Sequence, residues 1–396
     1  QPLVDFGVSQ ARKQKVVDQL WKGLQGLLTQ RKVTTFAGTG SLGPNHTVTV
    51  DDGTELVGTN IILAAGSVPR SLPGFDIDGR VVLTSDEVLS LTELPQTAVV
   101  VGGGAIGCEF ASMMSDLGVQ VTVLEALPRI IAGADKDVVD VLARSFKKRG
   151  IDVRTGVAIT GHTPNESGGT TVTFGDGEQV TADMVVMSVG RRARSEGLLT
   201  PSTGVIVDER GFVPVDEYMR TGADGVYAVG DLVSTPSTSA PHPALAHVGF
   251  AEAIIAIQHI LGEDPAPLDY TNVPWCIYTH PEIAFVGLTE EQAKAAGHDV
   301  VVSKHKYNGN GRALIVGESD GLVKVVAEKQ PDGTGGRILG VHMAGPWVTE
   351  QLGESYLAVN WEATALDVGR LIHAHPTLSE TFGETVLSLT GRGLHG

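Results

Sequence analysis

Two stretches of this sequence combine residue types and spacings that can support chemistry, and the first is rich in glycine. Gly102–Gly107, GGGAIG, follows the apolar run TAVVV and leads into AIGCEFASMMSDLG, which has a helical pattern. In a strand–loop–helix unit, Gly102 permits a tight turn, Gly104 lets the backbone approach a pyrophosphate, and Gly107 lets the helix pack closely on the strand. The first amide groups of the helix then face the phosphates. This context predicts a dinucleotide-binding loop.

An acidic residue follows the next apolar run. Glu125 ends the strand-like stretch VQVTVL and stands 18 residues after Gly107, where a carboxylate can accept both hydrogen bonds from an adenosine ribose. A 2′-phosphate would meet like charge at this carboxylate, so the pattern favours NAD over NADP. A second glycine match, Gly38–Gly43, is followed by Pro44 and a strand-like run rather than by a helix. That match therefore predicts a turn.

The second chemically suggestive stretch is HAHPTLSE, residues 373–380. Pro376 suits the first position of a helix and disfavours helical backbone at His375. This predicts that the His375 imidazole lies at the amino end of a helix. The helix dipole would lower the pKa of this histidine. Glu380 in the first turn would oppose that effect by accepting a hydrogen bond from one ring nitrogen, leaving the other nitrogen as a base. From these residues alone, a capping histidine beside an exposed glutamate explains the pattern equally well.

The elements that must position these residues include both helices and strands. Residues 11–30 have helical apolar spacing, whereas 33–65 have the short runs of an antiparallel meander that ends in a buried strand. Residues 97–124 predict a strand, a helix to about Leu117 and a second strand, which together form a βαβ unit. Further strands are expected within 151–190, 224–231 and 270–345, followed by helices to the end. The fold class is therefore α/β, with several compact domains in 396 residues.

The composition limits the classes of partner. Acidic residues outnumber basic ones 46 to 29, giving a formal charge of −17, which argues against nucleic acid or an anionic membrane as the main partner. The apolar runs are too short for a spanning helix, and the first residues lack a signal-peptide pattern. We therefore expect a cytoplasmic protein.

The segment Ser234–Pro243, rich in Ser, Thr and Pro, is expected to be an ordered loop at a cofactor.

Only two cysteines occur, Cys108 and Cys276, and they form no CxxC or CxxxxC pair. This excludes a disulfide framework, and both cysteines are expected to be small buried residues rather than reactive thiols.

Several motifs, in order along the whole chain, resemble those of the pyridine nucleotide–disulfide oxidoreductases. The resemblance is greatest to the members that oxidise protein-bound dihydrolipoamide with NAD+. It implies two nucleotide-binding Rossmann-like domains, for FAD and NAD, and a C-terminal α+β dimerisation domain. The expected domains are 1–80 and 198–270 for FAD, 81–197 for NAD and 271–396 for dimerisation. The motifs are ILAAGS (62–67), VVVGGGAIGCEFA, VLEALPRI (123–130), VGRRAR (189–194), VYAVGDL (226–232), ALAH (244–247), YTHPEIAFVG (278–287) and HAHPTLSE.

The resemblance also implies roles for individual residues. His375 and Glu380 would form an acid–base pair that reaches the flavin of the other subunit in a homodimer, and no metal site is implied. The residues that would contact NAD are Gly102, Gly103, Gly104, Ala105, Ile106, Gly107, Glu109, Glu125, Ile159 and Gly190. Those that would contact FAD are Gly38, Ala64, Ala65, Gly66, Ser67, Asp231, Ala244, Leu245, Ala246 and His247.

The expected activity is oxidation of a dihydrolipoyl group carried by an acyltransferase or carrier protein of a 2-oxoacid dehydrogenase complex. Dimerisation is expected through residues after about Tyr270, where Trp347 and Trp361 look exposed.

The sequence departs from the family pattern at Ala65, where threonine is commoner. The family's FAD fingerprint and CxxxxC pair would be expected before Gln1. Alternatives are a glutathione-type or mercuric reductase, a soluble transhydrogenase, or a dimerising NAD-binding fragment without turnover.

Overall fold

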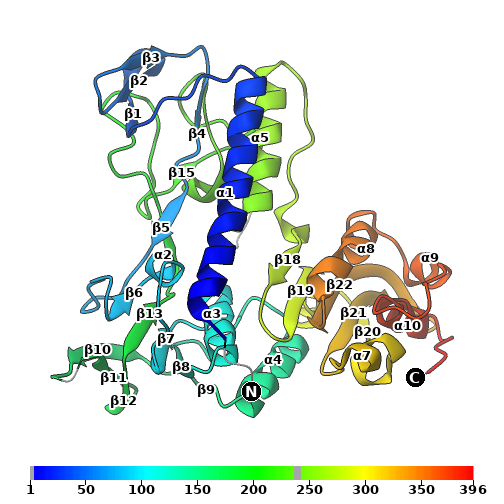
Figure 1. Ribbon diagram of the computed structural model, residues 1–396. Helices are drawn as coiled ribbons and strands as arrows, with labels where there is room; N and C mark the ends of the chain where they lie inside the picture. The colour runs from blue at the N-terminus through cyan, green and yellow to red at the C-terminus, as the bar shows by residue number, and fades with distance from the viewer. Residues whose placement is uncertain (1–3, 167, 236–241, 396) are drawn as a thin grey trace. The chain divides into compact units, whose positions relative to one another are not determined.

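The computed structural model describes residues 4–166, 168–235 and 242–395, and Figure 1 labels most of its helices and strands. The chain divides into two units. Gln1–Arg70, Ser90–Glu93 and Gly190–Tyr270 form the first, and Ser71–Leu89, Leu94–Val189 and Thr271–Gly396 form the second. Residues 236–241 of the expected loop Ser234–Pro243 lie outside the described residues. In the part of the chain that is described, no helix is both long and apolar enough to cross a bilayer.

A parallel pair of strands positions the candidate residues of the first unit. β4 (Ile61–Leu63) pairs in parallel with β16 (Val226–Ala228), so the segments that follow the two strands leave at the same edge. β16 leads into the 3-10 turn η2 (Gly230–Leu232), against which α5 (Ala246–Ile260) packs. The other strands of this unit are β1 (Gly40–Leu42), β2 (Thr47–Val50), β3 (Glu55–Val57), β5 (Ser67–Pro69), β14 (Arg191–Ala193), β15 (Val213–Pro214) and β17 (Val233–Ser234).

The predicted antiparallel run is confirmed for β1, β2 and β3, which form a three-stranded antiparallel sheet. It is wrong at both ends, because residues 33–36 form no strand and β4 pairs in parallel with β16 instead of joining this sheet. The prediction of a turn at Gly38–Gly43 is partly wrong, because Gly40–Leu42 are β1 itself, in register with Val48–Val50. No α-helix follows this glycine segment, as expected, since Pro44–His46 form only a short 3-10 turn before β2.

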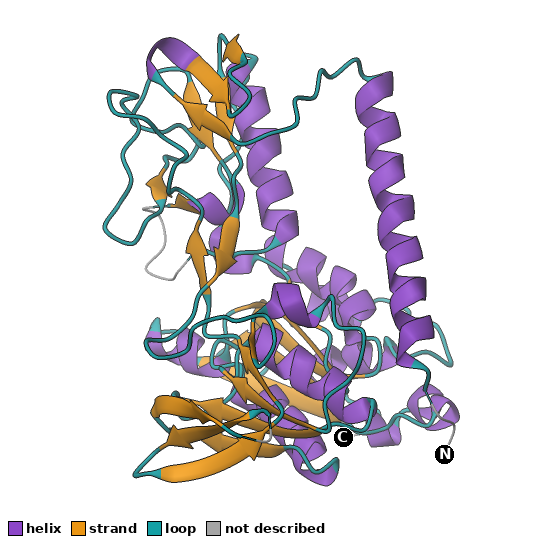
Figure 2. Ribbon diagram, turned by 60° about the vertical axis from the view of Figure 1, so that its left-hand side comes forward, coloured by secondary structure: helices purple, strands orange, loops and turns teal. Residues whose placement is uncertain are grey.

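The helix expected at 11–30 is α1 (Phe6–Gln30), which is longer than predicted at its amino end. The Asp5 side chain caps it by accepting a hydrogen bond from the Val8 amide at 3.2 Å, as N-cap residues commonly do. None of its residues is buried, and Leu20 is 69% exposed. Figure 2 shows α1 as one continuous helix, joined to β1 by an extended segment.

A parallel sheet forms the first half of the second unit. Its order is β6 (Val82–Leu83), β13 (Met184–Met187), β7 (Thr97–Val101), β8 (Gln120–Glu125) and β9 (Asp152–Thr155), and every pairing is parallel. The predicted βαβ unit is confirmed as β7, α3 (Ala105–Asp116) and β8. β7 and β13 are buried on both faces, as continuous valine-rich strands of parallel sheets usually are. The remaining elements are α2 (Ser85–Val88), α4 (Lys136–Lys148) and the antiparallel strands β10 (Ile159–Pro164), β11 (Thr170–Phe174) and β12 (Glu178–Ala182).

An antiparallel sheet forms the second half of this unit, in the region after Tyr270 where the sequence pattern predicted strands. Its order is β18 (Trp275–Ile277), β19 (Glu282–Gly287), β22 (Gly335–Gly345), β21 (Leu322–Lys329) and β20 (Val300–Lys306). Helices α8 (Val348–Asn360), α9 (Ala365–Gly369) and α10 (Glu380–Leu389) contribute to one apolar core with this sheet. This half of the unit also contains two short helices, α6 (Glu290–Ala295) and α7 (Gly311–Val316). The prediction of an α/β fold is thus confirmed.

A buried ion-pair cluster connects α4 to this sheet. The Lys324 side chain is 2% exposed, and its Nζ lies 2.9 Å from Asp135, 2.6 Å from Asp137 and 2.8 Å from Glu290. Burial alone would lower the pKa of Lys324, but the three carboxylates raise it. Hydrogen bonds from Lys294 and then Lys324 lower the pKa of Glu290 to about 2. Since charges this deep are stable only when paired, the cluster fixes the amino end of α4.

Candidate cofactor and acid–base sites

The glycine loop of the second unit has the geometry that its sequence predicts. Gly102 has φ +104°, and a Cβ there would overlap the Ser188 carbonyl oxygen, while a Cβ on Gly107 would overlap the Gly102 carbonyl oxygen. Gly104, the N-cap of α3, is exposed, and a Cβ added to it would meet no atom within 4 Å. The helix therefore begins at an open position without a side-chain cap, which fits a pyrophosphate on the amides that follow.

Glu125 lies beside this loop. Its Oε2 accepts a hydrogen bond from the Gly103 amide at 2.6 Å, and its Oε1 accepts one from the Leu127 amide at 2.7 Å. The carboxylate is therefore held at the carboxyl end of β8. Each oxygen keeps a second lone pair, which a ribose hydroxyl can use.

Ser188 supports the loop and was missed by sequence reasoning. Its hydroxyl lies 3.0 Å from the carbonyl oxygen of Val101 and 2.9 Å from that of Gly102. The residue follows β13, about 86 residues further along the chain, so one sequence gives no signal for it.

The other residues expected at NAD are more dispersed. Glu109 on α3 accepts a hydrogen bond from the Tyr278 amide at 2.8 Å, and burial raises the pKa of its carboxyl group. Ile159, at the start of β10, packs at the edge of the apolar cluster that includes Val101 and Leu124. Gly190 belongs to the first unit, next to β14, and has φ +109°. Their contacts with a nucleotide stay predictions.

In the first unit, the structure brings together residues expected at FAD. The loop Ala64–Ser67 follows β4, and Asp231 follows the neighbouring β16. The Ser67 hydroxyl donates a hydrogen bond to Asp231 Oδ2 at 2.6 Å. Arg191 donates to the Ser67 hydroxyl at 2.6 Å and to the Ser67 carbonyl oxygen at 2.8 Å. The motif VGRRAR contains Arg191, but its contact with Ser67 could not be read from the motif.

The helix start expected at the flavin is also present. Residues Ala244–His247 include the beginning of α5, whose N-cap Leu245 offers no side-chain acceptor. Leu245 therefore places no side-chain oxygen at the start of the helix, an arrangement that fits acceptor atoms of a flavin ring. Gly38 lies in another part of this unit, where a Cβ would contact Val50 and Asp51.

The hydrogen bond expected between His375 and Glu380 is present. His375 Nδ1 lies 2.8 Å from Glu380 Oε1, and Glu380 Oε2 accepts a hydrogen bond from the Thr377 amide at 2.7 Å. Burial alone would raise the pKa of Glu380, but the Thr377 amide and the His375 ring lower it below its ordinary value. The His375 side chain is 78% exposed, so its Nε2 is accessible to a substrate.

The expectation that Pro376 begins the helix was wrong. Helix α10 begins at Glu380 after the N-cap Ser379, and the His375–Pro376 peptide is cis. The Thr377 hydroxyl donates a hydrogen bond to the Ala374 carbonyl oxygen at 2.6 Å. Together with the Glu380 contact to the Thr377 amide, this bond stabilises a turn before the helix. Glu380 is nevertheless in the first turn, as predicted.

The two cysteines lie in separate elements. Cys108 is buried on α3 and Cys276 is half-buried on β18, and burial raises the pKa of both thiols. Neither is therefore activated as a thiolate.

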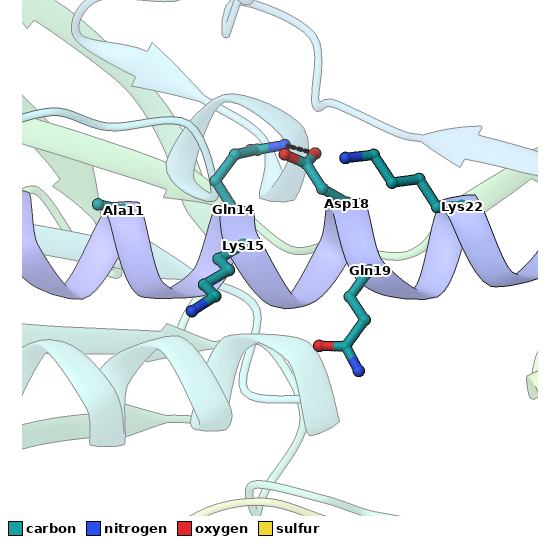
Figure 3. Close-up of a pocket in the computed structure, with 6 residues that line it drawn as sticks. All are labelled: Ala11, Gln14, Lys15, Asp18, Gln19 and Lys22. Carbon is teal, nitrogen blue, oxygen red and sulfur yellow. Dashed lines mark hydrogen bonds between the residues drawn. The ribbon is translucent and has the colours of Figure 1, made fainter.

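A surface hollow of about 640 Å³ lies along α1, and Figure 3 shows its lining. All its residues, including Gln14 and Asp18, which share a hydrogen bond of 2.8 Å, come from this one helix. One helix face encloses no ligand, so we assign the hollow no site.

The fold and these sites define an α/β protein with a dinucleotide-binding loop and an exposed histidine–carboxylate pair. Residues 4–253 match the pyridine nucleotide-disulphide oxidoreductase family, and residues 273–386 match the dimerisation domain of that family. The chain belongs to the pyridine nucleotide-disulphide oxidoreductase family. The expected cofactors, FAD and NAD, are those that this family uses.

Individual relatives agree with this assignment. A dihydrolipoyl dehydrogenase of Bacillus subtilis (strain 168) is 42% identical, over 99% of this chain and 84% of the relative. Among solved structures, LpdA from Mycobacterium tuberculosis matches with a TM-score of 0.88 at 27% identity, over 98% of this chain and 84% of that one. The HOCl-induced flavoprotein disulfide reductase RclA from Escherichia coli matches with a TM-score of 0.88 at 26% identity, over 97% and 86%.

Proposed function

We propose that the protein is a dihydrolipoyl dehydrogenase, which oxidises a protein-bound dihydrolipoyl group with NAD+. The dithiol gives up two electrons and two protons and forms a disulfide, while NAD+ accepts a hydride and one proton is released. The observation that carries this proposal is the exposed His375–Glu380 pair, joined at 2.8 Å, because a thiol substrate needs a base that it can reach.

The two cofactors would be held by separate sets of residues. For NAD, the set is the loop Gly102–Gly107 with Glu125; for FAD, it is the loop Ala64–Ser67, Asp231 and the start of α5. When bound, FAD would supply the two-electron redox chemistry between NAD+ and a cysteine pair of the family's CxxxxC type, which takes the electrons of the dithiol. The protein's residues bind the two groups and fix their orientation.

His375 would act as the base. Since Glu380 is an ionised acceptor, Nδ1 of His375 carries the proton of their hydrogen bond, and Nε2 presents its lone pair. That nitrogen takes the proton of a dihydrolipoyl thiol. The imidazolium that results is stabilised by the Glu380 carboxylate, and the Thr377 amide keeps the carboxylate in place.

The proposed partner is a lipoyl-bearing acyltransferase or carrier protein. The formal charge of −17 suits a basic binding domain on that partner. We place the reaction in the cytoplasm because its electron acceptor, NAD+, is an intracellular cofactor.

Steady-state turnover tests the proposed function. The full-length holoenzyme, given dihydrolipoamide and NAD+, should form one NADH per dithiol, and reduced glutathione in place of dihydrolipoamide should give almost none. The opposite preference, or flavin-containing protein without dihydrolipoamide turnover, would contradict the proposal.

Nucleotide choice gives a second prediction. We expect NAD(H) to bind at least about tenfold more tightly than NADP(H), because Glu125 would face a 2′-phosphate with like charge. Arg129, four residues later, is paired with Glu291 at 3.3 Å and is not positioned as a substitute partner. Calorimetric titration with NADH and NADPH measures the ratio, and Glu125→Gln should reduce it. Equal binding of the two nucleotides would refute the assignment.

Self-association gives a third prediction. Residues 273–386 match a dimerisation domain, and Trp347, Trp361 and Ile372 are 51%, 77% and 99% exposed in the single chain. Since a twofold interface would bury such apolar side chains, we expect a homodimer at micromolar concentration. In sedimentation velocity, Ile372→Lys should shift the protein toward monomer, whereas Val57→Lys, at a site 76% exposed on β3, should not. A monomeric wild type would count against the dimer.

A further inference from the structure

Glu252 on α5 is a fully buried carboxylate to which the proposed mechanism assigns no role. The residue is 0% exposed. Its Oε2 accepts a hydrogen bond from the Gly230 amide at 2.6 Å. Its Oε1 lies 2.6 Å from His242 Nε2 and accepts a hydrogen bond from the Tyr270 hydroxyl at 2.7 Å.

Because burying an acidic side chain is unfavourable in free energy, we expect Glu252 and its hydrogen-bond partners to have a specific role. A carboxylate removed from water is costly unless several donors satisfy it, and an apolar residue at this position of α5 would avoid that cost. Burial first, and then the charge of Glu252, raise the pKa of Tyr270. Tyr270 therefore keeps its proton and acts as a donor to the carboxylate.

The contact with Gly230 is the informative one, because it joins two parts of the expected flavin site. Gly230 has φ +73° and directly precedes Asp231. The helix touches this turn a second time at Gly249, where an added Cβ would lie 3.4 Å from Gly230 Cα. Glu252 therefore couples the turn that carries Asp231 to the helix whose first amides follow Leu245.

We propose that Glu252 is a positioning residue of the flavin site. The inference rests on the proposed function, which places FAD between these groups. Asp231 would accept a hydrogen bond from the ribitol, and the start of α5 would donate to the pyrimidine end of the flavin. The hydrogen bond from Gly230 to Glu252 keeps those two sets of atoms at a fixed separation, so FAD binds without first ordering the turn.

Two substitutions test whether the length of the Glu252 side chain or its negative charge is what FAD binding requires. Glu252→Gln keeps the length and an oxygen that can accept from Gly230, while the amide NH2 can face His242, whose ring nitrogen can accept. Glu252→Asp keeps the charge but is one methylene shorter, so it cannot span to Gly230. Glu263→Asp, at an exposed residue just beyond α5, is the matched control.

The measurement is the Kd of FAD for the full-length protein stripped of flavin, together with the visible circular dichroism of the rebound flavin. We expect Glu252→Asp to weaken FAD binding by about 10- to 100-fold, as for loss of a hydrogen bond to a charged group, and to alter the dichroism. Glu252→Gln and Glu263→Asp should stay within about twofold of wild type.

Other outcomes overturn the inference. Weaker FAD binding in Glu252→Gln, together with wild-type FAD binding in Glu252→Asp, would show that the charge of Glu252 matters and not the position of its oxygen atoms. Lower melting temperatures with unchanged Kd in both would leave Glu252 a purely structural residue. If the Asp variant does not fold, Glu252→Met, which keeps the length of the side chain but offers no oxygen to the Gly230 amide, takes its place. FAD binding about 10- to 100-fold weaker than wild type then supports the proposal, and binding within about twofold of wild type overturns it. Wild-type protein that binds no FAD would instead refute the proposed function.

Discussion

We expect His375→Gln in the full-length holoenzyme to lose about 10²- to 10⁴-fold in dihydrolipoamide oxidation, the usual contribution of a general base. Glutamine keeps much of the size and polarity of histidine but cannot take a proton from a thiol. Glu380→Gln should lose less, because His375 remains and loses only its orienting carboxylate. Steady-state rates of NADH formation measure both variants.

The alternative for this pair is that it only stabilises the turn before α10. In that case, His375→Gln would melt at a lower temperature, while the folded fraction would turn over at a nearly normal rate. His395→Gln is the matched control, since His395 is 79% exposed near the end of the chain, and it should keep wild-type activity. Retained dihydrolipoamide turnover in His375→Gln would exclude the catalytic role.

The second large effect concerns stability. Lys324→Met should lower the free energy of unfolding at pH 7 by about 3–5 kcal/mol, because it leaves Asp135, 2% exposed, as an uncompensated buried charge. Lys304→Met is the control, since Lys304 binds Asp137 at 2.7 Å but is 44% exposed. That exposed pair should contribute only about 0–1 kcal/mol. Equal destabilisation of the two variants in urea titrations would contradict this account.

The pH dependence of this effect follows from Glu290. Its folded pKa, about 2, lies below the ordinary value of 4.5, so its contribution is complete above pH 4.5 and is lost as the pH falls toward 2. In Lys324→Met, the Glu290 pKa should return toward 4.5. The difference in stability between wild type and variant should therefore shrink over this range of pH. A difference that grows there would mean that the cluster is not ionised as described.

Local pattern was sufficient to predict the glycine loop and the elements around it. The loop Gly102–Gly107 depends on its own backbone conformation and on the strand and helix next to it, all of which lie within about thirty residues of sequence. Glu125 could be placed for the same reason. The pairing of His375 with Glu380 needs only five residues of separation.

The contacts that one sequence could not reveal join distant residues. Ser67 and Asp231 are 164 positions apart, Arg191 and Ser67 are 124 apart, and only the parallel pairing of β4 with β16 brings the first two together. The Lys324 cluster depends on packing between α4 and a strand almost 190 positions later. The error at Pro376 has a different origin. Its ring permits a helix start, but a hydrogen bond from the Thr377 hydroxyl to the Ala374 carbonyl oxygen and one from the Thr377 amide to Glu380 stabilise a turn there instead.

Rapid-mixing kinetics of the bound flavin test the central claim most directly. In the full-length holoenzyme, dihydrolipoamide should reduce the flavin quickly in wild type and about 10²- to 10⁴-fold more slowly in His375→Gln, while NADH should reduce it at the same rate in both. This pattern follows because only the thiol half-reaction needs a proton acceptor at His375. Equal slowing of both half-reactions, or no slowing of either, would contradict the account.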